Sequence, residues 1–185
     1  MMFLPIETPA FRLRAYRPSD VAVVAEHRSD PTTAEWQSWA VPYSVEKAQQ
    51  LIDSVMALDG PTPGEWWELV IADPTTDGFM GSLAVHLAEH GHSAEIGYAL
   101  RVEHRGKGLA TAAAQVLVDA LFGRPEINRL EGSLHPNNVA SAIVLERLGF
   151  VYEGTSRQSF WVEDVVSDDA HYGLLREEWE ALRSG

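Results

Sequence analysis

The sequence predicts an α/β protein of the α+β type, in which helices flank a mixed and mostly antiparallel sheet. Three segments with strand character, 66–72, 79–87 and 94–102, follow one another with short turns between them, which is typical of a meander. Beyond residue 102, segments with helical periodicity alternate with short apolar strands. The length of 185 residues suits one domain, and we expect that domain to span 1–185.

The part of the chain before the meander predicts one strand and two helices. Phe11 to Tyr16 alternates apolar and polar residues, as a strand does. Pro18-Ser19-Asp20 supplies helix-start residues for the first helix, and Ser44 can cap a second helix whose apolar positions continue to Val55. Gly60 to Gly64, which includes two prolines, then ends helical structure before the first meander strand.

The part of the chain after the meander predicts helices and strands in alternation. In order these are a helix over 108–121, a strand over 128–134, a helix over 138–148 that Gly149 ends, a strand from 150, a strand over 171–175 and a short acidic helix. We expect Glu163, Asp164, Asp168 and Asp169 in a solvated loop before the last strand.

Composition narrows the classes of function. The formal net charge of −13 disfavours binding to nucleic acid or to anionic membranes and favours a cationic partner, such as an amine. Cysteine is absent, so disulfides and thiol nucleophiles are excluded. No apolar run approaches the length of a membrane span, and the N-terminal sequence lacks signal-peptide character, so we expect a cytoplasmic protein.

Residues 101–111 carry the most informative motif, Arg-Val-Glu-His-Arg-Gly-Lys-Gly-Leu-Ala-Thr, between a predicted strand and a predicted helix. Gly106 and Gly108 leave the backbone N–H groups bare, and a helix N-terminus attracts anions. Together with Arg101, Arg105 and Lys107, this context favours a phosphate-binding loop over a simple turn with solvated basic residues.

Two common phosphate-binding motifs fit this loop poorly. The nucleoside triphosphate loop requires a hydroxyl residue after its lysine, where Gly108 stands. The dinucleotide fingerprint requires a small residue where Thr111 stands and a parallel strand before the loop, whereas an antiparallel meander precedes it here.

Several motifs in order resemble the GNAT acetyltransferases, in particular the RimJ/RimL-like branch that acetylates ribosomal-protein N-termini. Arg105-Gly-Lys-Gly-Leu-Ala110 matches the coenzyme A loop of that superfamily, and Ala94-Glu-Ile-Gly-Tyr-Ala-Leu100 resembles the strand before it. His135-Pro-Asn-Asn-Val-Ala-Ser141, Leu145-Glu-Arg-Leu-Gly-Phe150 and 169–179 resemble the later helices and the closing strand of the branch. Arg12-Leu-Arg14 with Asp20 resembles its opening, so the likeness runs from about Glu7 to Leu182.

The resemblance implies a six- to seven-stranded sheet whose two central strands splay apart, with acetyl-coenzyme A bound in the splay as co-substrate. The pyrophosphate would bind the backbone N–H groups of 106–110, and the pantetheine arm would pair with the strand edge at 100–102. The residues implied to bind the cofactor are Leu100, Arg101, Val102, Arg105, Gly106, Lys107, Gly108, Leu109, Ala110, Thr111 and Asn138.

Acyl transfer to an amine requires a neutral amine, a donor for the developing oxyanion and a donor for the departing thiolate. The resemblance implies a backbone N–H near Leu100 for the first donor and Ser141 for the second, since Leu145 stands where many family members have a tyrosine. A local alternative is that Ser141 only bonds the backbone of its helix. For the base we favour Glu95, predicted opposite His86, with Glu68 second; a structural Glu–His pair is the alternative reading.

Fewer residues indicate where the acceptor amine binds. Trp36, Trp39 and Tyr43 precede the second helix, which borders the acceptor cleft in this family, although tryptophans at this spacing are more often packing residues. Glu68 and His86 complete the predicted substrate contacts, and no metal is expected. The predicted acceptor is a cationic amine, either a peptide N-terminus or a small amine such as a polyamine or an aminoglycoside. A non-catalytic coenzyme A-binding module is the alternative to an enzyme, and either a monomer or a homodimer is compatible with the sequence.

Overall fold

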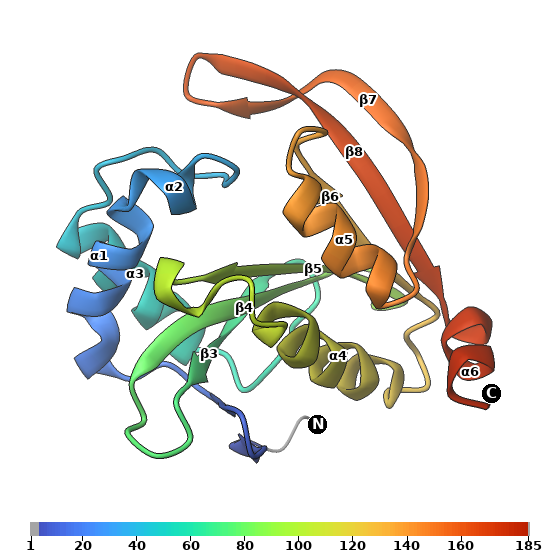
Figure 1. The fold of residues 1–185 in the computed structure, drawn as a ribbon, viewed down its shortest axis with the longest axis horizontal. Coiled ribbons are helices and arrows are strands. Elements are labelled where there is room, and N and C mark those ends of the chain that lie inside the picture. The colour runs from blue at the N-terminus through green and yellow to red at the C-terminus, as the bar shows by residue number, and fades with distance from the viewer. Residues whose placement is uncertain (1–3, 185) are drawn as a thin grey trace.

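The computed structural model describes residues 4–184 and contains one eight-stranded sheet in the order β1-β2-β3-β4-β5-β6-β8-β7 (Figure 1). The strands are β1 (Ile6–Glu7), β2 (Arg12–Arg14), β3 (Trp66–Ala72), β4 (Phe79–Leu87), β5 (Ser93–Leu100), β6 (Arg129–Leu134), β7 (Val151–Val162) and β8 (Val165–Leu175). The helices are α1 (Val21–Ser29), α2 (Pro31–Ala34), α3 (Val45–Met56), α4 (Leu109–Phe122), α5 (Val139–Arg147) and α6 (Arg176–Ser184). All pairs except β5–β6 are antiparallel, so the predicted fold class is confirmed.

The meander forms as predicted, with β3 and β4 at the predicted bounds. β5 ends two residues earlier than predicted, because Val102 begins a short 3-10 helix (Val102–His104) instead of continuing the strand. The sheet gains one strand over the prediction: β1 contributes only two residues paired with β2, too few to give an alternating pattern. The short helix α2 was also not predicted; Asp30 caps it by accepting a hydrogen bond from the N–H of Thr33.

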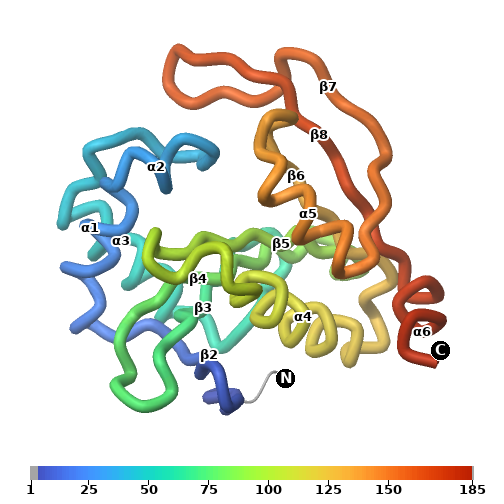
Figure 2. The backbone as a smooth tube through the Cα atoms, in the orientation of Figure 1, coloured from blue at the N-terminus to red at the C-terminus, as the bar shows by residue number. Residues whose placement is uncertain are grey.

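The last two strands form a long hairpin that extends beyond the rest of the molecule (Figures 1 and 2). β8 begins at Val165, so the expected solvated loop at 163–169 is wrong for its second half. Asp168 and Asp169 lie on the strand, where Asp169 pairs with Ser156 of β7. Their acidic character does not predict a strand; at these positions β8 pairs with β7 alone, since β6 pairs only with residues 170–175 of β8.

The two faces of the sheet carry different helices. Glu68, Ala84 and Gly97 are register partners across β3, β4 and β5, so they share one face, and α1 packs there through Arg28. Tyr98 neighbours Gly97 on β5 and therefore points to the opposite face, where it contacts Ser141 of α5. This arrangement places two chemically different surfaces on either side of the same central strands.

The two central strands, β5 and β6, are paired over only three residues. Their parallel register joins Ser93 to Arg129 and ends with Glu95 opposite Glu131. From there β5 continues along β4 to Leu100, whereas β6 continues along β8 to Leu134. The predicted splay between the central strands is therefore present, and it opens directly after Glu95.

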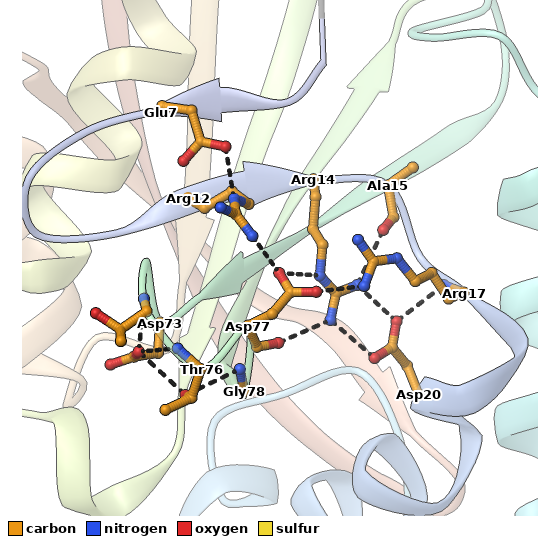
Figure 3. Close-up of polar contacts among 11 residues, drawn as sticks. Glu7, Arg12, Arg14, Ala15, Arg17, Asp20, Asp73, Thr76, Asp77 and Gly78 are labelled. Atoms are coloured by element: carbon orange, nitrogen blue, oxygen red, sulfur yellow. Dashed lines mark hydrogen bonds and ion pairs between the residues drawn. The ribbon is translucent and has the colours of Figure 1, made fainter.

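An arginine network fixes the N-terminal strand to the rest of the domain (Figure 3). Arg12, Arg14 and Arg17 all contact Asp77 in the turn between β3 and β4. Arg14 also forms two hydrogen bonds of 2.8 and 2.9 Å with the buried Asp20, which leads into α1. The Arg14–Asp20 contact gives the opening motif of the sequence a structural role.

Candidate active site

The loop before α4 has the geometry that the sequence predicted. Gly106 and Gly108 adopt φ of 73° and 79°, a left-handed conformation that costs other residues about 1–2 kcal/mol. A Cβ atom at either position would meet no atom within 4 Å, so the space above the loop is open. The first helical backbone bond runs from the N–H of Ala112 to the carbonyl of Gly108, which leaves the preceding N–H groups of α4 without a helical acceptor.

A cavity of about 560 Å³ begins at this loop. It runs between α2 on one side and α5 on the other, with the end of β5 as its floor. The predicted cofactor residues that line it are Leu100, Arg105, Gly106, Gly108, Leu109, Ala110, Thr111 and Asn138. Ser141 and Trp36 line it as well, so one hollow contains the predicted phosphate-binding loop, the predicted thiolate donor and a predicted acceptor residue.

Three residues predicted to bind the cofactor do not line this cavity. The Arg101 guanidinium bonds Glu26 and Glu103, and the Lys107 ammonium donates to the carbonyl of Glu103 at 2.7 Å. Val102 lies in the 3-10 helix, half exposed. All three residues follow the end of β5 at Leu100, outside the strand that forms the floor of the cavity.

The Arg105 guanidinium is held by hydrogen bonds within the protein, whereas the sequence predicted a cation that faces the phosphate. Its guanidinium donates to the carbonyl of Leu100 at 3.0 Å and to the hydroxyls of Thr32 and Thr33 at 3.2 and 2.6 Å. It therefore fastens α2 to the loop and shapes the entrance of the cavity. No local signal in the sequence indicates Thr32 and Thr33, because they lie more than 70 residues before the motif.

The splay-facing edge of β5 ends at Leu100. The N–H of Arg101 donates to Met80 of β4, and successive N–H groups along a strand alternate in direction, so the N–H of Leu100 points into the splay. This position agrees with the thioester-polarising donor that the family resemblance implied. The expected edge at 100–102 is corrected to the part of β5 that ends at Leu100, since Val102 is not in the strand.

The Ser141 hydroxyl does not bond the backbone of its own helix. It donates to the phenol oxygen of Tyr98 at 2.9 Å, and the Tyr98 hydroxyl donates to the carbonyl of Ser141 at 2.9 Å. Asn138 caps α5 by accepting from the N–H of Ser141 at 3.1 Å. Leu145 is buried next to Gly132 of β6; it lines the small hollow between β5 and β6 but not the main cavity. The sequence analysis did not single out Tyr98, although it lies within the motif Ala94 to Leu100.

Glu95 lies on the face opposite Tyr98, at the point where the splay opens. Its register partner on β4 is His86, as predicted. Burial and then the nearby charges of Asp169 and Glu131 raise the pKa of Glu95, and His86 lowers it by a smaller amount. A carboxyl group with a raised pKa, beside a gap in the sheet, is a candidate general base.

A second hollow of about 520 Å³ is lined by residues of the neighbouring strands β6, β8 and β7. Glu131, Ser133 and His171 line it, and the His171 imidazole bonds the hydroxyls of Ser133 and Ser156 at 3.2 and 2.9 Å. The sequence did not indicate Glu131 as a neighbour of Glu95, because that proximity depends on the parallel pairing of β5 with β6.

The residues predicted to contact the acceptor divide into two groups. Trp36 lies at the splay, against His135 with a ring separation of 5.0 Å. Trp39, Tyr43 and Glu68 instead surround the buried Arg28: Trp39 lies 4.1 Å from its guanidinium, and Glu68 bonds it at 2.7 Å. These three residues line neither hollow described above.

Glu68 is buried, and the Tyr16 hydroxyl donates to the same carboxylate that pairs with Arg28. Its two oxygens are thus occupied by internal partners, which favours Glu95 over Glu68 as the base. Between residues 4 and 184 no group of three or more histidine, aspartate or glutamate side chains is arranged to hold a metal ion. None of the helices in that range is long and apolar enough to cross a membrane.

Comparison with known proteins agrees with this geometry. A family model described as "Acetyltransferase (GNAT) domain" matches residues 11–151. The protein named "Putative ribosomal N-acetyltransferase YdaF" of Bacillus subtilis (strain 168) is 38% identical over 106 residues, which are 56% of this chain and 58% of that protein.

Two solved structures share the fold. RimL, a ribosomal alpha-N-protein acetyltransferase in complex with coenzyme A, superposes with a TM-score of 0.78 at 22% identity and covers 91% of this chain and 95% of its own. Spermidine N-acetyltransferase from Vibrio cholerae, in complex with coenzyme A and spermine, gives a TM-score of 0.78 at 18% identity, over 94% and 99% of the two chains. At these identities the likeness concerns the fold. From the family match, the splayed sheet and the glycine loop at the start of α4, this chain belongs to the GNAT family of N-acetyltransferases and is similar to its RimJ/RimL-like branch.

Proposed function

We propose that this enzyme transfers an acetyl group from acetyl-coenzyme A to a primary amine, and that the amine is the N-terminus of a protein or peptide. The observation that carries the proposal is the course of the main cavity. The cavity begins at backbone N–H groups of α4 that have no helical acceptor, and it ends beside Ser141, where β5 and β6 separate. Glu95 lies at the same point of separation, on the opposite face of the sheet.

The chain's own residues fit coenzyme A. The open space above Gly106 and Gly108, with the N–H groups that follow them, suits a diphosphate. The N–H of Leu100 suits a carbonyl oxygen that gains negative charge, because it is a fixed donor in a partly buried site. When bound, the co-substrate supplies an activated acetyl group as a thioester.

On the other side of the splay, Glu95 would take the proton that the amine loses on attack, either directly or through water. Direct attack by the amine agrees with the absence of cysteine, which excludes a thiol acyl-enzyme. The carboxylates of Glu95, Glu131 and Asp169 would attract a cationic acceptor to this face. That charge also suits a polyamine, which is the second candidate acceptor.

The test is a panel of amines incubated with acetyl-coenzyme A and followed by release of free thiol. The panel contains peptides with free N-termini, the same peptides with blocked N-termini, spermidine and an aminoglycoside. We expect turnover with free peptide N-termini only. Turnover with spermidine alone would move the acceptor to polyamines, and coenzyme A binding without turnover on any amine would favour a non-catalytic binding module.

A further inference from the structure

Tyr98 and Ser141 form a hydroxyl pair inside the splay. Both side chains line the main cavity and the small hollow between β5 and β6 that continues from it. The serine donates to the phenol oxygen at 2.9 Å, and the phenol donates to the serine's own carbonyl at 2.9 Å. The two residues come from different elements, β5 and α5, so the pair also bridges the strand and the helix that border the splay.

The direction of these bonds leaves the Ser141 oxygen with unused acceptor capacity. A hydroxyl group has one proton to donate and two lone pairs that can accept. To donate to a ligand, Ser141 would therefore have to turn its single proton away from Tyr98. If that proton turned toward a ligand, the phenol proton of Tyr98 could turn from the carbonyl to the serine oxygen. Burial raises the pKa of Tyr98 above its usual value, so the phenol keeps its proton at working pH.

We propose that Tyr98 and Ser141 act together as the donor to the departing sulfur, with Ser141 facing the sulfur and Tyr98 as the positioning residue that supports it. This inference rests on the proposed function. In the reaction the C–S bond breaks and the C–N bond forms. The amine loses one proton through Glu95, and the thiolate gains one from solvent.

Neither hydroxyl of the pair is consumed in this scheme. The pair stabilises the thiolate by hydrogen bonds alone, since a buried phenol is too weak an acid to give up its proton to a thiolate with an ordinary pKa near 8.5. Chains of hydrogen bonds polarise one another, so a phenol that donates to the Ser141 oxygen makes the Ser141 proton a better donor.

The test compares the affinity of coenzyme A with that of desulfo-coenzyme A by calorimetry at pH 9 and pH 6. This readout needs no acceptor and no turnover. At pH 9 the free thiol is largely ionised, and we expect the wild-type enzyme to prefer coenzyme A by about 10- to 100-fold, the range for hydrogen bonds to a charged group. At pH 6, where the thiol is protonated, the ratio of the two affinities should approach one.

Tyr98→Phe and Ser141→Ala should each remove most of the preference at pH 9 while leaving desulfo-coenzyme A affinity unchanged. With a productive acceptor, both variants should lower kcat about 10-fold or more, with little change in KM for acetyl-coenzyme A. Tyr152→Phe is the matched control, because the Tyr152 hydroxyl bonds only Thr155 on the exposed surface of β7.

Thermal unfolding of each variant verifies that the fold is intact. A wild-type preference in Tyr98→Phe, with the preference lost in Ser141→Ala, would overturn the role of Tyr98. Equal affinity of the wild-type enzyme for both ligands would overturn the donor pair. Failure of the wild-type enzyme to bind either ligand would instead contradict the proposed function itself.

Discussion

At the scale of single residues, Glu95 is the side chain whose surroundings most constrain its chemistry. It lies within the sheet, where burial and the carboxylates of Asp169 and Glu131 raise its pKa, and His86 and the Ser133 hydroxyl lower it by smaller amounts. A carboxyl group kept for structural pairing would normally have a lowered pKa, because its partners stabilise the charge. The raised pKa of Glu95 therefore favours a role as base over a structural Glu–His pair.

Replacing Glu95 by Gln should lower kcat by about 100-fold, the lower end of the range for general base catalysis. In the wild-type enzyme kcat should fall as pH decreases through the raised pKa of Glu95, and this acid limb should disappear in the variant. The pH dependence of kcat separates this group from the free amine, whose titration appears in kcat/KM. If kcat of the variant still fell at low pH as in the wild-type enzyme, Glu95 would not be the base.

The same substitution should not destabilise the protein. Because the folded-state pKa of Glu95 is raised, the folded protein binds more protons than the unfolded chain between the two pKa values, so this carboxyl contributes less stability as pH rises through that window. Neutral Gln should keep or increase the free energy of unfolding at pH 8 in urea titrations. Glu89→Gln, on the exposed hairpin, is the control.

At the scale of elements, the start of α4 is where we expect the diphosphate of the co-substrate to bind. Gly108 leaves the helix N-terminus open, and no atom lies within 4 Å of the position that a Cβ would take. Gly108→Glu should weaken coenzyme A binding by roughly 100-fold or more, because two like charges about 4 Å apart repel by about 4 kcal/mol near a protein surface. Calorimetry measures the loss.

Gly91→Glu gives a matched control for that experiment. Gly91 has φ of 74° and equally open surroundings, but it lies in the hairpin between β4 and β5. The backbone strain of the two variants should be similar, at about 1–2 kcal/mol each. Equal coenzyme A affinity of the two variants would contradict the assignment of the α4 loop.

At the scale of the whole molecule, the buried pair of Arg28 and Glu68 joins α1 to the sheet beneath the segment that leads to α3. Trp39 and Tyr43 cover the guanidinium, and Trp39 also donates to the carbonyl of Arg28 at 2.9 Å. The pair thereby holds the segment that carries Trp36 to the splay. These contacts indicate a structural role for Glu68.

Glu68→Gln should lower the free energy of unfolding by about 3 kcal/mol, because it leaves the Arg28 charge buried without its partner. Urea unfolding measures this change, and kcat of the folded variant should stay near the wild-type value. The double variant Arg28→Met with Glu68→Leu should regain part of the lost stability. Wild-type stability together with a large loss of kcat would instead identify Glu68 as the base.

The local features of this enzyme could be predicted from the sequence: the meander, the glycine loop at the start of α4, the Ser44 cap of α3 and the cross-strand pairing of Glu95 with His86. These depend on neighbouring residues, through strand alternation, capping and turn chemistry, and each could be predicted from a short stretch of chain. The extra strand β1 and the helix α2 escaped prediction because each is too short for a periodic pattern.

Which distant residues meet at the splay depends on tertiary packing and could not be predicted from the sequence. Tyr98 reaches Ser141 over 43 positions of sequence, Arg105 reaches Thr33 over 72, and Asp169 approaches Glu95 from the strand beyond β6. Side-chain period tells which face of a strand a residue occupies, but it does not tell which strand lies alongside or where two strands separate. The parallel pairing of β5 with β6 ends after three residues, and that packing outcome places the donor pair and the base on opposite sides of one gap.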